Sequence, residues 1–353
     1  MQGTGGGPPA SRKDHTLSHG AKTKKTVLYT CPNMTAYDVF NGDADGICAL
    51  HQLRLHDPLP YAQLVTGVKR DIRLLEKIKS VKNAHITVVD ISMDRNREPL
   101  LTLLAQGNSI VYIDHHFSGD IPKDSGLKAH IDPAPQTCSS MIVDTLLAGA
   151  HRKWAIVGAF GDNLDETALR AAQTMGLSQE ETEQLRETGV LLNYNGYGAT
   201  MEDLFFPPDE LFRHVHAFAD PLEFHASSPM LQTLRRGYRD DMNRAGMAVP
   251  VQDGNWGRIF ELPNVSWARR VAGVFANTLA REKPDLAHAL IIANTDGSLR
   301  VSVRAPLNRR QGADKLCRRF PTGGGRAAAA GINHLPAELK EEFINAFSRQ
   351  FST

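Results

Sequence analysis

The sequence predicts an α/β protein in which a doubly wound, mainly parallel N-terminal sheet is joined by a helical linker to a smaller C-terminal α/β domain. Three observations support this fold class. In the first half, short apolar runs alternate with amphipathic stretches, a pattern typical of a parallel sheet covered on both faces. A charged segment punctuated by prolines interrupts the pattern between residues 196 and 246. A second α/β pattern then continues to the C-terminus.

Apolar runs of strand length and helical periodicities define the expected elements. In the first half we expect strands at 37–40, 63–66, 85–91, 109–113 and 130–133, and helices at 46–55, 72–78, 97–105, 139–147 and 154–160. In the second half we expect a charged connecting helix at 229–244, a strand at 258–262, helices at 267–282 and 336–351, and a hairpin of 289–293 with 299–303 around Asp296-Gly297. The expected domains are a disordered tail at 1–25, an N-terminal domain at 26–195, the linker at 196–246 and a C-terminal domain at 247–353.

Composition excludes several classes of protein. Lys and Arg total 40 and Asp and Glu total 39, which gives a net charge of +1 over 353 residues. Proteins that coat long nucleic acid need many basic contacts with phosphates, so we expect no long duplex partner. No apolar run approaches the ~20 residues that span a bilayer, so we expect no membrane partner. The four cysteines form no C-x-x-C pair, which favours a reducing, cytoplasmic location.

Acidic and histidine side chains follow three of the predicted strands and one apolar helix. These residues are Asp43, Asp45, Asp90, Asp114, His115, His116 and Asp162. In an open α/β sheet, ligands bind beyond the carboxyl ends of the strands, so the strand-end residues are expected to converge on one crevice. Bringing several carboxylates together out of water costs a prohibitive amount of free energy unless a cation compensates their charge. Carboxylates with imidazole suit Mn²⁺ or a similar ion, and the lack of thiolates argues against structural zinc.

Each of these residues alone has an ordinary explanation. A single aspartate at a strand end is usually a helix cap or a turn residue, and a histidine pair is more often a surface feature than a ligand. Their joint occurrence on this strand pattern is poorly explained by chance. The combination resembles the DHH superfamily of phosphoesterases, in particular its oligoribonuclease-type members. Residues 322–331, TGGGRAAAAG, resemble the Gly-Gly-Gly-x-x-x-Ala-x-Gly signature of the associated C-terminal domain, and the resemblance spans residues 35–335.

The resemblance implies a catalytic domain at 26–195 that holds two Mn²⁺ ions, with Mg²⁺ and Co²⁺ as alternatives. The implied metal ligands are Asp43, Asp45, Asp90, His115 and Asp162, and Asp90 bridges both ions. His116 is implied to face the substrate phosphate, and Asp114 to orient the histidines from behind. The implied reaction is metal-assisted attack of water on phosphorus, without a protein nucleophile.

The sequence departs from the family pattern at the first ion. Many members carry a histidine ligand four residues before the first aspartate, where this chain has Val39. Asn41 stands where the exonuclease branch carries a further aspartate. Three alternatives stay open for this ion: weak binding, binding through Asn41 and water, or arrival with the substrate.

The C-terminal domain carries the expected substrate-binding residues. Gly323, Gly324 and Gly325 allow close backbone approach to an anion, and Arg304 and Arg326 can bind phosphate with two donors. Taken alone these are a tight turn and solvated arginines, whereas the resemblance implies that they hold the distal end of a nucleotide. Many members have histidine at the position of Arg326, and arginine there favours an extra phosphate or a guanine edge. In the N-terminal domain, Ser139 and Ser140 start a helix, where we expect them to act as its cap, with donation to a phosphate as the alternative.

We therefore expect a metal-dependent phosphodiesterase that hydrolyses very short oligoribonucleotides or linear dinucleotides such as pGpG to nucleoside monophosphates. A small net charge suits a substrate with few phosphates. The alternatives are a cyclic-dinucleotide phosphodiesterase or 3′,5′-bisphosphonucleotide phosphatase, a polyphosphatase or pyrophosphatase suggested by the basic residues 304–319, and a non-catalytic nucleotide sensor suggested by Val39. The sequence leaves the oligomeric state open, a homodimer included.

Overall fold

The structure is a computed structural model that describes residues 35–352 together with Met1 and Gly3. The predicted disordered tail at 1–25 lies outside the described residues except for these two. In the part of the chain that is described, no helix is both long and apolar enough to cross a membrane.

The first sheet has five strands, all parallel, in the order β2-β1-β3-β4-β5. Its strands are β1 (Ala36–Phe40), β2 (Gln63–Val65), β3 (His85–Val89), β4 (Ser109–Asp114) and β5 (Leu127–Ile131). Val39 of β1 lies between Val65 of β2 and Val88 of β3 in the register. Every residue of β3 is buried, as expected for a central strand covered on both faces. The predicted parallel α/β sheet is therefore confirmed.

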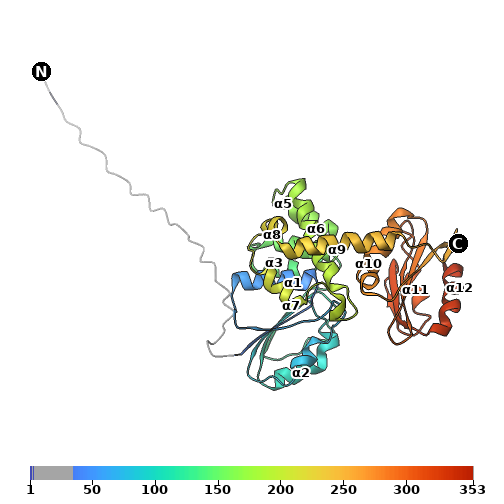
Figure 1. The fold of residues 1–353 in the computed structure, drawn as a ribbon. Helices are drawn as coiled ribbons and strands as arrows, with labels where there is room; N and C mark the ends of the chain where they lie inside the picture. Colours follow the sequence, from blue (N-terminus) through green and yellow to red (C-terminus); the bar gives the residue numbers. More distant parts are fainter. Residues whose placement is uncertain (2, 4–34, 353) are drawn as a thin grey trace. The chain divides into compact units, whose positions relative to one another are not determined.

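Helices cover both faces of this sheet (Figure 1). They are α1 (Ala44–His56), η1 (Leu74–Ile78), η2 (Asp94–Asn96), α2 (Arg97–Ala105), α3 (Ser139–Leu146), α4 (Arg152–Gly161), α5 (Asp165–Thr174) and α6 (Gln179–Gly196). On one face, Leu74 of η1 and Leu100 of α2 share an apolar core with Val88 and Tyr112 of the sheet. On the other face, α1 contacts β1 and β3, and α3 contacts β4. Helix α4 packs against α1, α3 and α6 and forms a further layer.

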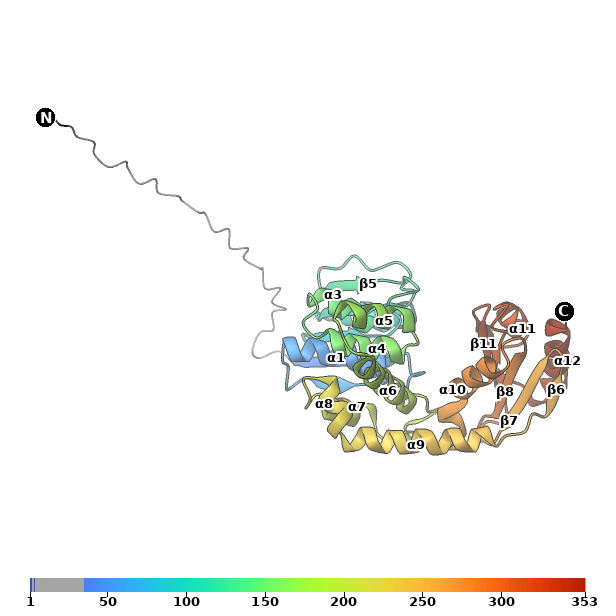
Figure 2. The same ribbon diagram turned by 90° about the horizontal axis from the view of Figure 1, so that it is seen from above.

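Residues 196–246 contain four helices, and prolines help to start three of them. They are η3 (Met201–Asp203), α7 (Pro208–Val215), α8 (Pro221–Ser227) and α9 (Pro229–Gly246). Proline at the first position of α7, α8 and α9 has its φ already set for the helix and lacks an N–H that would have no partner there. Figure 2 shows α9 as one long, continuous helix between α8 and the strands that follow it. Helix α9 packs against α6 and α10, and its buried residues include Leu231, Leu234 and Asp241.

The second sheet is mixed and has the order β10-β11-β9-β8-β7-β6, in which only β7 and β8 are parallel. Its elements are β6 (Gln252–Gly254), β7 (Gly257–Leu262), α10 (Ser266–Glu282), β8 (Ala287–Ala293), β9 (Leu299–Arg304), α11 (Ala313–Cys317), β10 (Gly323–Gly325), β11 (Ala329–Leu335), η4 (Ala337–Leu339) and α12 (Lys340–Phe351). The predicted hairpin is present, with Ala293 opposite Leu299. Phe343 and Phe347 of α12 share a core with Val301 and Ile332 of the sheet.

The structure contains elements that the sequence prediction lacks, α5, α6 and β11 among them, and two predicted elements differ in position or type. Strand β5 occupies Leu127–Ile131 instead of 130–133, because its pairing with β4 ends where Asp114 meets Ile131. The helix expected at 72–78 is a short 3₁₀ turn that starts at Leu74. The side chain of Asn96 explains this, since it accepts from the N–H of Leu75 at 3.2 Å and donates to the carbonyl of Ile72 at 2.6 Å. These two backbone groups therefore have a partner outside the segment and do not need a helix.

Candidate active site

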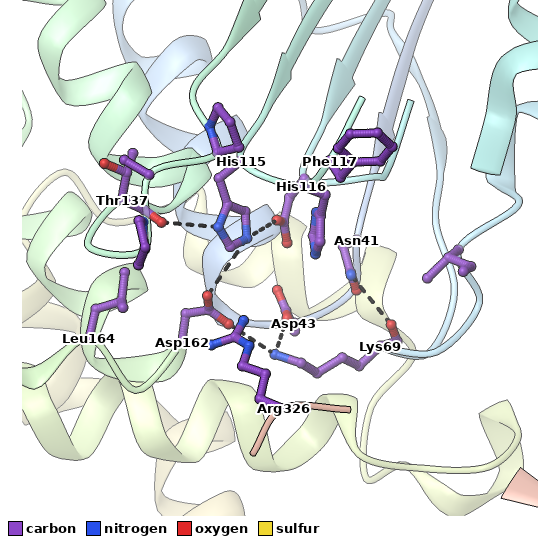
Figure 3. Close-up of a pocket in the computed structure, with 15 residues that line it drawn as sticks. Asn41, Asp43, Lys69, His115, His116, Phe117, Thr137, Asp162, Leu164 and Arg326 are labelled. Carbon is purple, nitrogen blue, oxygen red and sulfur yellow. Dashed lines mark hydrogen bonds and ion pairs between the residues drawn. The ribbon is translucent and has the colours of Figure 1, made fainter. Parts of the chain in front are cut away.

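The strand order reverses direction at β1, with β2 on one side of it and β3 on the other. In open α/β sheets, ligands bind at such a switch point, beyond the carboxyl ends of the strands. A cavity of about 430 Å³ opens there. It is lined by the predicted residues Asn41, Asp43, Asp90, His115, His116, Asp162 and Arg326, together with Lys69, Ile72, Phe117, Pro133, Ala134, Pro135, Thr137 and Leu164. Figure 3 shows the polar side chains of this group pointing toward a common centre.

Asp43 and Asp45 stand at the start of α1, and both are buried. Asp43 caps the helix by accepting from the N–H of Gly46 at 3.1 Å. Both oxygens of Asp45 accept backbone N–H groups from the start of α3, those of Ser139 at 2.7 Å and Ser140 at 2.8 Å. The partial positive charge of the α3 N-terminus favours the Asp45 carboxylate at this place.

The expectation that Ser139 and Ser140 cap α3 is wrong. Cys138 occupies the N-cap position and makes no side-chain cap hydrogen bond. The first N–H groups of the helix are instead satisfied by Asp45, which lies 94 residues earlier in the chain. The Ser139 hydroxyl is therefore free to donate to Asp90 Oδ1, at 3.0 Å.

Asp90 follows β3 with an unusual backbone. Its φ is 59°, in the left-handed region, which few residues other than glycine adopt. Such strain concentrates at functional sites, where the surrounding structure enforces it. Burial, together with the negative charges of Asp45 and Asp43, raises the pKa of Asp90 well above its ordinary value. The site therefore concentrates more negative charge than its own groups neutralise.

His115 is held with one ring nitrogen directed at the acids. Its Nδ1 lies 3.0 Å from the carbonyl of Thr137, to which it donates, so Nε2 is left facing the cavity. Nε2 lies 3.5 Å from Asp90 Oδ1 and 3.7 Å from Asp162 Oδ2. Burial lowers the pKa of His115, but Asp90, Asp45 and Asp162 outweigh it and raise the pKa to about 10.

His116 and Asp114 form a separate pair beside this group. His116 Nδ1 lies 2.7 Å from Asp114 Oδ1, and Asp114 is completely buried. The buried carboxylate thus fixes the orientation of a largely exposed imidazole at the cavity wall. The resemblance implies that Asp114 orients both histidines, whereas among the described residues its hydrogen bond is to His116, and His115 is held by the carbonyl of Thr137.

Lys69 and Phe117 line the cavity but are not among the predicted site residues. The Lys69 ammonium lies 2.5 Å from Asp43 Oδ2 and 3.3 Å from Asp162 Oδ1. Burial lowers the pKa of Lys69, but Asp43 and Asp162 outweigh it and raise the pKa well above the ordinary value. Phe117 directly follows His116 and is 74% exposed, which is unusual for a phenylalanine. Lys69 lies in the loop after β2 and belongs to no motif, whereas Phe117 can be proposed from its place next to the histidines.

The donor atoms of the site fit a divalent cation. Two groups of three, Asp90 with His115 and His116, and Asp45 with His115 and Asp162, have ligand atoms within 4.8 Å of one another. Asn41 Oδ1 is buried in the same region and has no hydrogen-bond partner within residues 35–352. Carboxylate and amide oxygens with imidazole suit Mn²⁺ and Mg²⁺.

Of the predicted substrate-binding residues in the second sheet and its loops, Arg326 lines this cavity, and its side chain extends toward Asp162 in Figure 3. Arg304 donates to Asn277 Oδ1 at 2.7 Å and to the carbonyl of Gly273 at 3.4 Å, both on α10. Gly323–Gly325 form strand β10, which pairs with β11. Neither Arg304 nor these glycines are among the described residues that line the cavity around Asp43.

A second cavity, of about 510 Å³, is rich in donors. It is lined by Arg70, Asn294, Arg300, Val301, Ser302, Thr322, Gly331, Asn333 and His334. Burial and the charges of Arg70 and Arg269 lower the pKa of Arg300 to about 10. Arg300 Nη1 is buried and has no hydrogen-bond partner in the described part of the chain. The cavity therefore presents positive charge that a bound anion would neutralise.

No family model matches the chain, and no curated protein matches it. Among solved structures, the exonuclease RecJ bound to manganese is 16% identical, covers 90% of this chain and 90% of its own, and has a TM-score of 0.59. A DHH-domain protein described as a member of a family of ribosomal proteins is 13% identical, with coverage of 90% and 86% and a TM-score of 0.56.

A pGpG-specific phosphodiesterase, PggH from Vibrio cholerae, is 12% identical, with coverage of 90% of this chain and 99% of its own and a TM-score of 0.50. At such identities the likeness concerns the fold. It extends over both sheets, since each comparison covers nine-tenths of this chain. The fold that the sequence resemblance implies is thus confirmed, and the chain has the fold of the DHH-domain proteins.

Proposed function

We propose that the protein is a metal-dependent phosphodiesterase that hydrolyses very short oligoribonucleotides or linear dinucleotides such as pGpG to nucleoside monophosphates. One observation carries the proposal: carboxylates at the start of α1, after β3 and after α4 meet an imidazole after β4 at the switch point of the sheet. Such a concentration of desolvated negative charge has a chemical use if it holds a cation.

Asp45, Asp90, His115 and Asp162 are the residues proposed to hold the cation. With a divalent ion held by these residues, a bound water molecule would become more acidic and negative charge on the phosphoryl group would be neutralised. Thr137 fixes the tautomer of His115, which leaves Nε2 as its ligand atom. His116, oriented by Asp114, presents its other nitrogen to a phosphate in the cavity, and Arg326 supplies a guanidinium at the same cavity.

The cavity walls support a nucleotide substrate. The exposed ring of Phe117 offers a surface on which a base can stack, a contact that tolerates any base. Lys69 lines the cavity around Asp43. The next residue, Arg70, lines the second cavity, which also contains Arg300, so consecutive residues of the chain line the two cavities. A substrate such as pGpG carries two phosphates, and we propose that its scissile phosphate binds at the acids and its terminal phosphate at Arg70 and Arg300.

Inorganic polyphosphate is a weaker candidate for the substrate. That hypothesis expects the basic residues 304–319 to crowd the site. Arg309 and Lys315 of this run instead line another cavity, which shares no described residue with the one around Asp43. A cyclic dinucleotide or a 3′,5′-bisphosphonucleotide would use the same catalytic residues. Only a direct comparison of hydrolysis rates distinguishes these substrates from pGpG. The structural likeness to PggH and to manganese-bound RecJ supports phosphodiester hydrolysis in general.

The test is chromatography of products from a panel of substrates: pGpG, a cyclic dinucleotide, a 3′,5′-bisphosphonucleotide and tripolyphosphate, each with Mn²⁺ and with excess chelator. We expect GMP from pGpG as the fastest reaction, and no product with chelator. Faster hydrolysis of tripolyphosphate would replace the proposed substrate class. Absence of hydrolysis throughout the panel would favour a nucleotide sensor over an enzyme.

A further inference from the structure

The position of Lys69 is fixed from two sides. Its backbone N–H donates to the carbonyl of Gly196 at the end of α6, at 2.9 Å. Its carbonyl accepts from the amide of Asn41, at 3.4 Å. The backbone is therefore attached both to the loop after β1 and to α6, and the side chain extends from there into the acidic cavity (Figure 3).

The Lys69 ammonium has a complete set of partners. Its three donors face Asp43 Oδ2 at 2.5 Å, Asn193 Oδ1 at 3.1 Å and Asp162 Oδ1 at 3.3 Å. The ring of Tyr197 lies 5.6 Å away and adds a cation–π contact. Tyr197 is in turn tied to Asn193, whose amide donates to its hydroxyl at 2.8 Å. Three oxygens and an aromatic face thus surround one positive charge, as they would a bound cation.

Asp43 is engaged on both oxygens. Oδ1 accepts from the N–H of Gly46, and Oδ2 is paired with Lys69. Neither of the two groups of clustered metal-donor atoms found among the described residues includes Asp43, whereas both include His115. At the place where the family pattern has a histidine ligand for the first ion, Val39 is completely buried and offers no donor. The surroundings of Asp43 are therefore built for an ammonium, while the donors that remain lie on the His115 side of the site.

We propose that the Lys69 ammonium is a resident cation that replaces the first of the two divalent ions, so that the site binds a single ion among the residues named above, Asp45, Asp90, His115 and Asp162. This inference rests on the metal centre proposed above and changes the number of divalent ions in it from two to one. The fixed ammonium pairs with the Asp43 carboxylate whether or not a metal ion is bound. The one ion that binds is then placed next to a positive charge that belongs to the chain, and both can face the same phosphate.

The test counts Mn²⁺ bound to the full chain, by isothermal titration and by metal analysis after gel filtration, and records the electron paramagnetic resonance spectrum. We expect the wild-type protein to bind one Mn²⁺ with the hyperfine-split spectrum of an isolated ion. Lys69→Ala frees Asp43 Oδ2 and opens the space beside it, so this variant should bind a second Mn²⁺ and show the broadened spectrum of a coupled pair. Lys69→Arg keeps the charge and should bind one ion.

Lys77→Ala is the matched control, because Lys77 pairs with Asp71 outside the cavity and should leave the count at one. Two coupled ions in the wild-type protein would overturn the inference, and so would a single ion in Lys69→Ala. Absence of bound Mn²⁺ in the wild-type protein would overturn the proposed metal centre itself. The two failures are therefore distinguishable.

Discussion

The four acidic residues of the site are chemically identical but have different surroundings. Asp45 is neutralised by the N-terminus of α3, and Asp43 by Lys69. Asp90 and Asp162 have less compensation, and burial raises the pKa of each. At the scale of single residues, we therefore expect Asp90 and Asp162, with His115, to respond most strongly to a divalent ion.

Replacing Asp90 by Asn should lower Mn²⁺-stimulated hydrolysis of pGpG by about 100-fold or more, because a neutral amide cannot compensate a cation as the carboxylate does. His115→Ala should have a similar effect. Product chromatography measures the rate, and far-UV circular dichroism checks that the fold is kept. Asp209→Asn, at a partly exposed acid on α7 that pairs with Arg213, is the charge-matched control. Full activity in either site variant would refute its assignment.

Phe117 allows a separate test of the base-binding surface. Phe117→Ala should raise the KM for pGpG about 5- to 150-fold, the equivalent of one lost base–aromatic stack at ~1–3 kcal/mol. Mn²⁺ affinity should not change, because the ring offers no ligand atom. Phe117→Tyr retains the aromatic face, so its KM for pGpG should equal that of the wild-type protein. An unchanged KM in Phe117→Ala would place the base elsewhere.

Helix packing positions Asp45 and Asp162, which lie at the start of α1 and just after the end of α4. The helices approach closely because glycines meet at their contacts. A Cβ at Gly161 would lie 2.3 Å from Ala44 Cβ, and one at Gly189 would lie 2.3 Å from the carbonyl oxygen of Val157. No side chain fits there unless a backbone moves.

Gly189→Ala should therefore destabilise the protein by ~1–3 kcal/mol, the usual range for overpacking. Urea denaturation followed by circular dichroism measures the change. Gly246→Ala is the matched control, since a Cβ at the end of α9 meets nothing within 4 Å and alanine favours the helix. Equal stability of Gly189→Ala and the wild-type protein would contradict the close packing of α6 on α4.

The elements that the sequence predicts well are those with a strong local pattern. The strands β1, β3 and β4 are continuous apolar runs, and the acids that follow them can be located because strand ends of a parallel sheet share one edge. Asn96 cannot be foreseen as the partner of η1, because its hydrogen bonds join segments 21 and 24 residues apart. Lys69 escapes prediction for the same reason, since its partners Asp162 and Asn193 come from distant helices. Tertiary contacts of this kind leave no periodic signal in the sequence.

Histidines buried in the interior link the stability of the whole molecule to pH. His51 of α1 packs on Trp154, its Nε2 lies 3.0 Å from the carbonyl of Phe218, and its Nδ1 lies 3.0 Å from Nδ1 of His216. Burial, with His216 adding to it, lowers the pKa of His51 to about 3, whereas the unfolded chain has the ordinary value near 6.5. Protonation therefore favours the unfolded state, and stability should fall as pH drops from about 6.5 toward 3.

The loss of folding free energy caused by His51 should reach ~2 kcal/mol at pH 5. Below that pH the free energy of unfolding should fall by up to ~1.4 kcal/mol per pH unit. The free energy of unfolding in urea, measured at pH 7.5 and at pH 5, gives this difference. His51→Gln has no titrating ring, so its difference between the two pH values should be smaller by about that amount. The same pH dependence in the variant and in the wild-type protein would show that His51 is not a buried neutral group.

The account as a whole depends on a divalent ion binding among Asp90, His115 and Asp162. Anomalous diffraction from crystals soaked in Mn²⁺ tests this most directly, because it locates the ion without relying on turnover. We predict a strong anomalous peak for one Mn²⁺ ion within bonding distance of His115 Nε2 and of carboxylate oxygens of Asp90 and Asp162. A protein crystal that takes up no Mn²⁺ at these three side chains, or that shows the His115 ring turned away from them, would contradict the account.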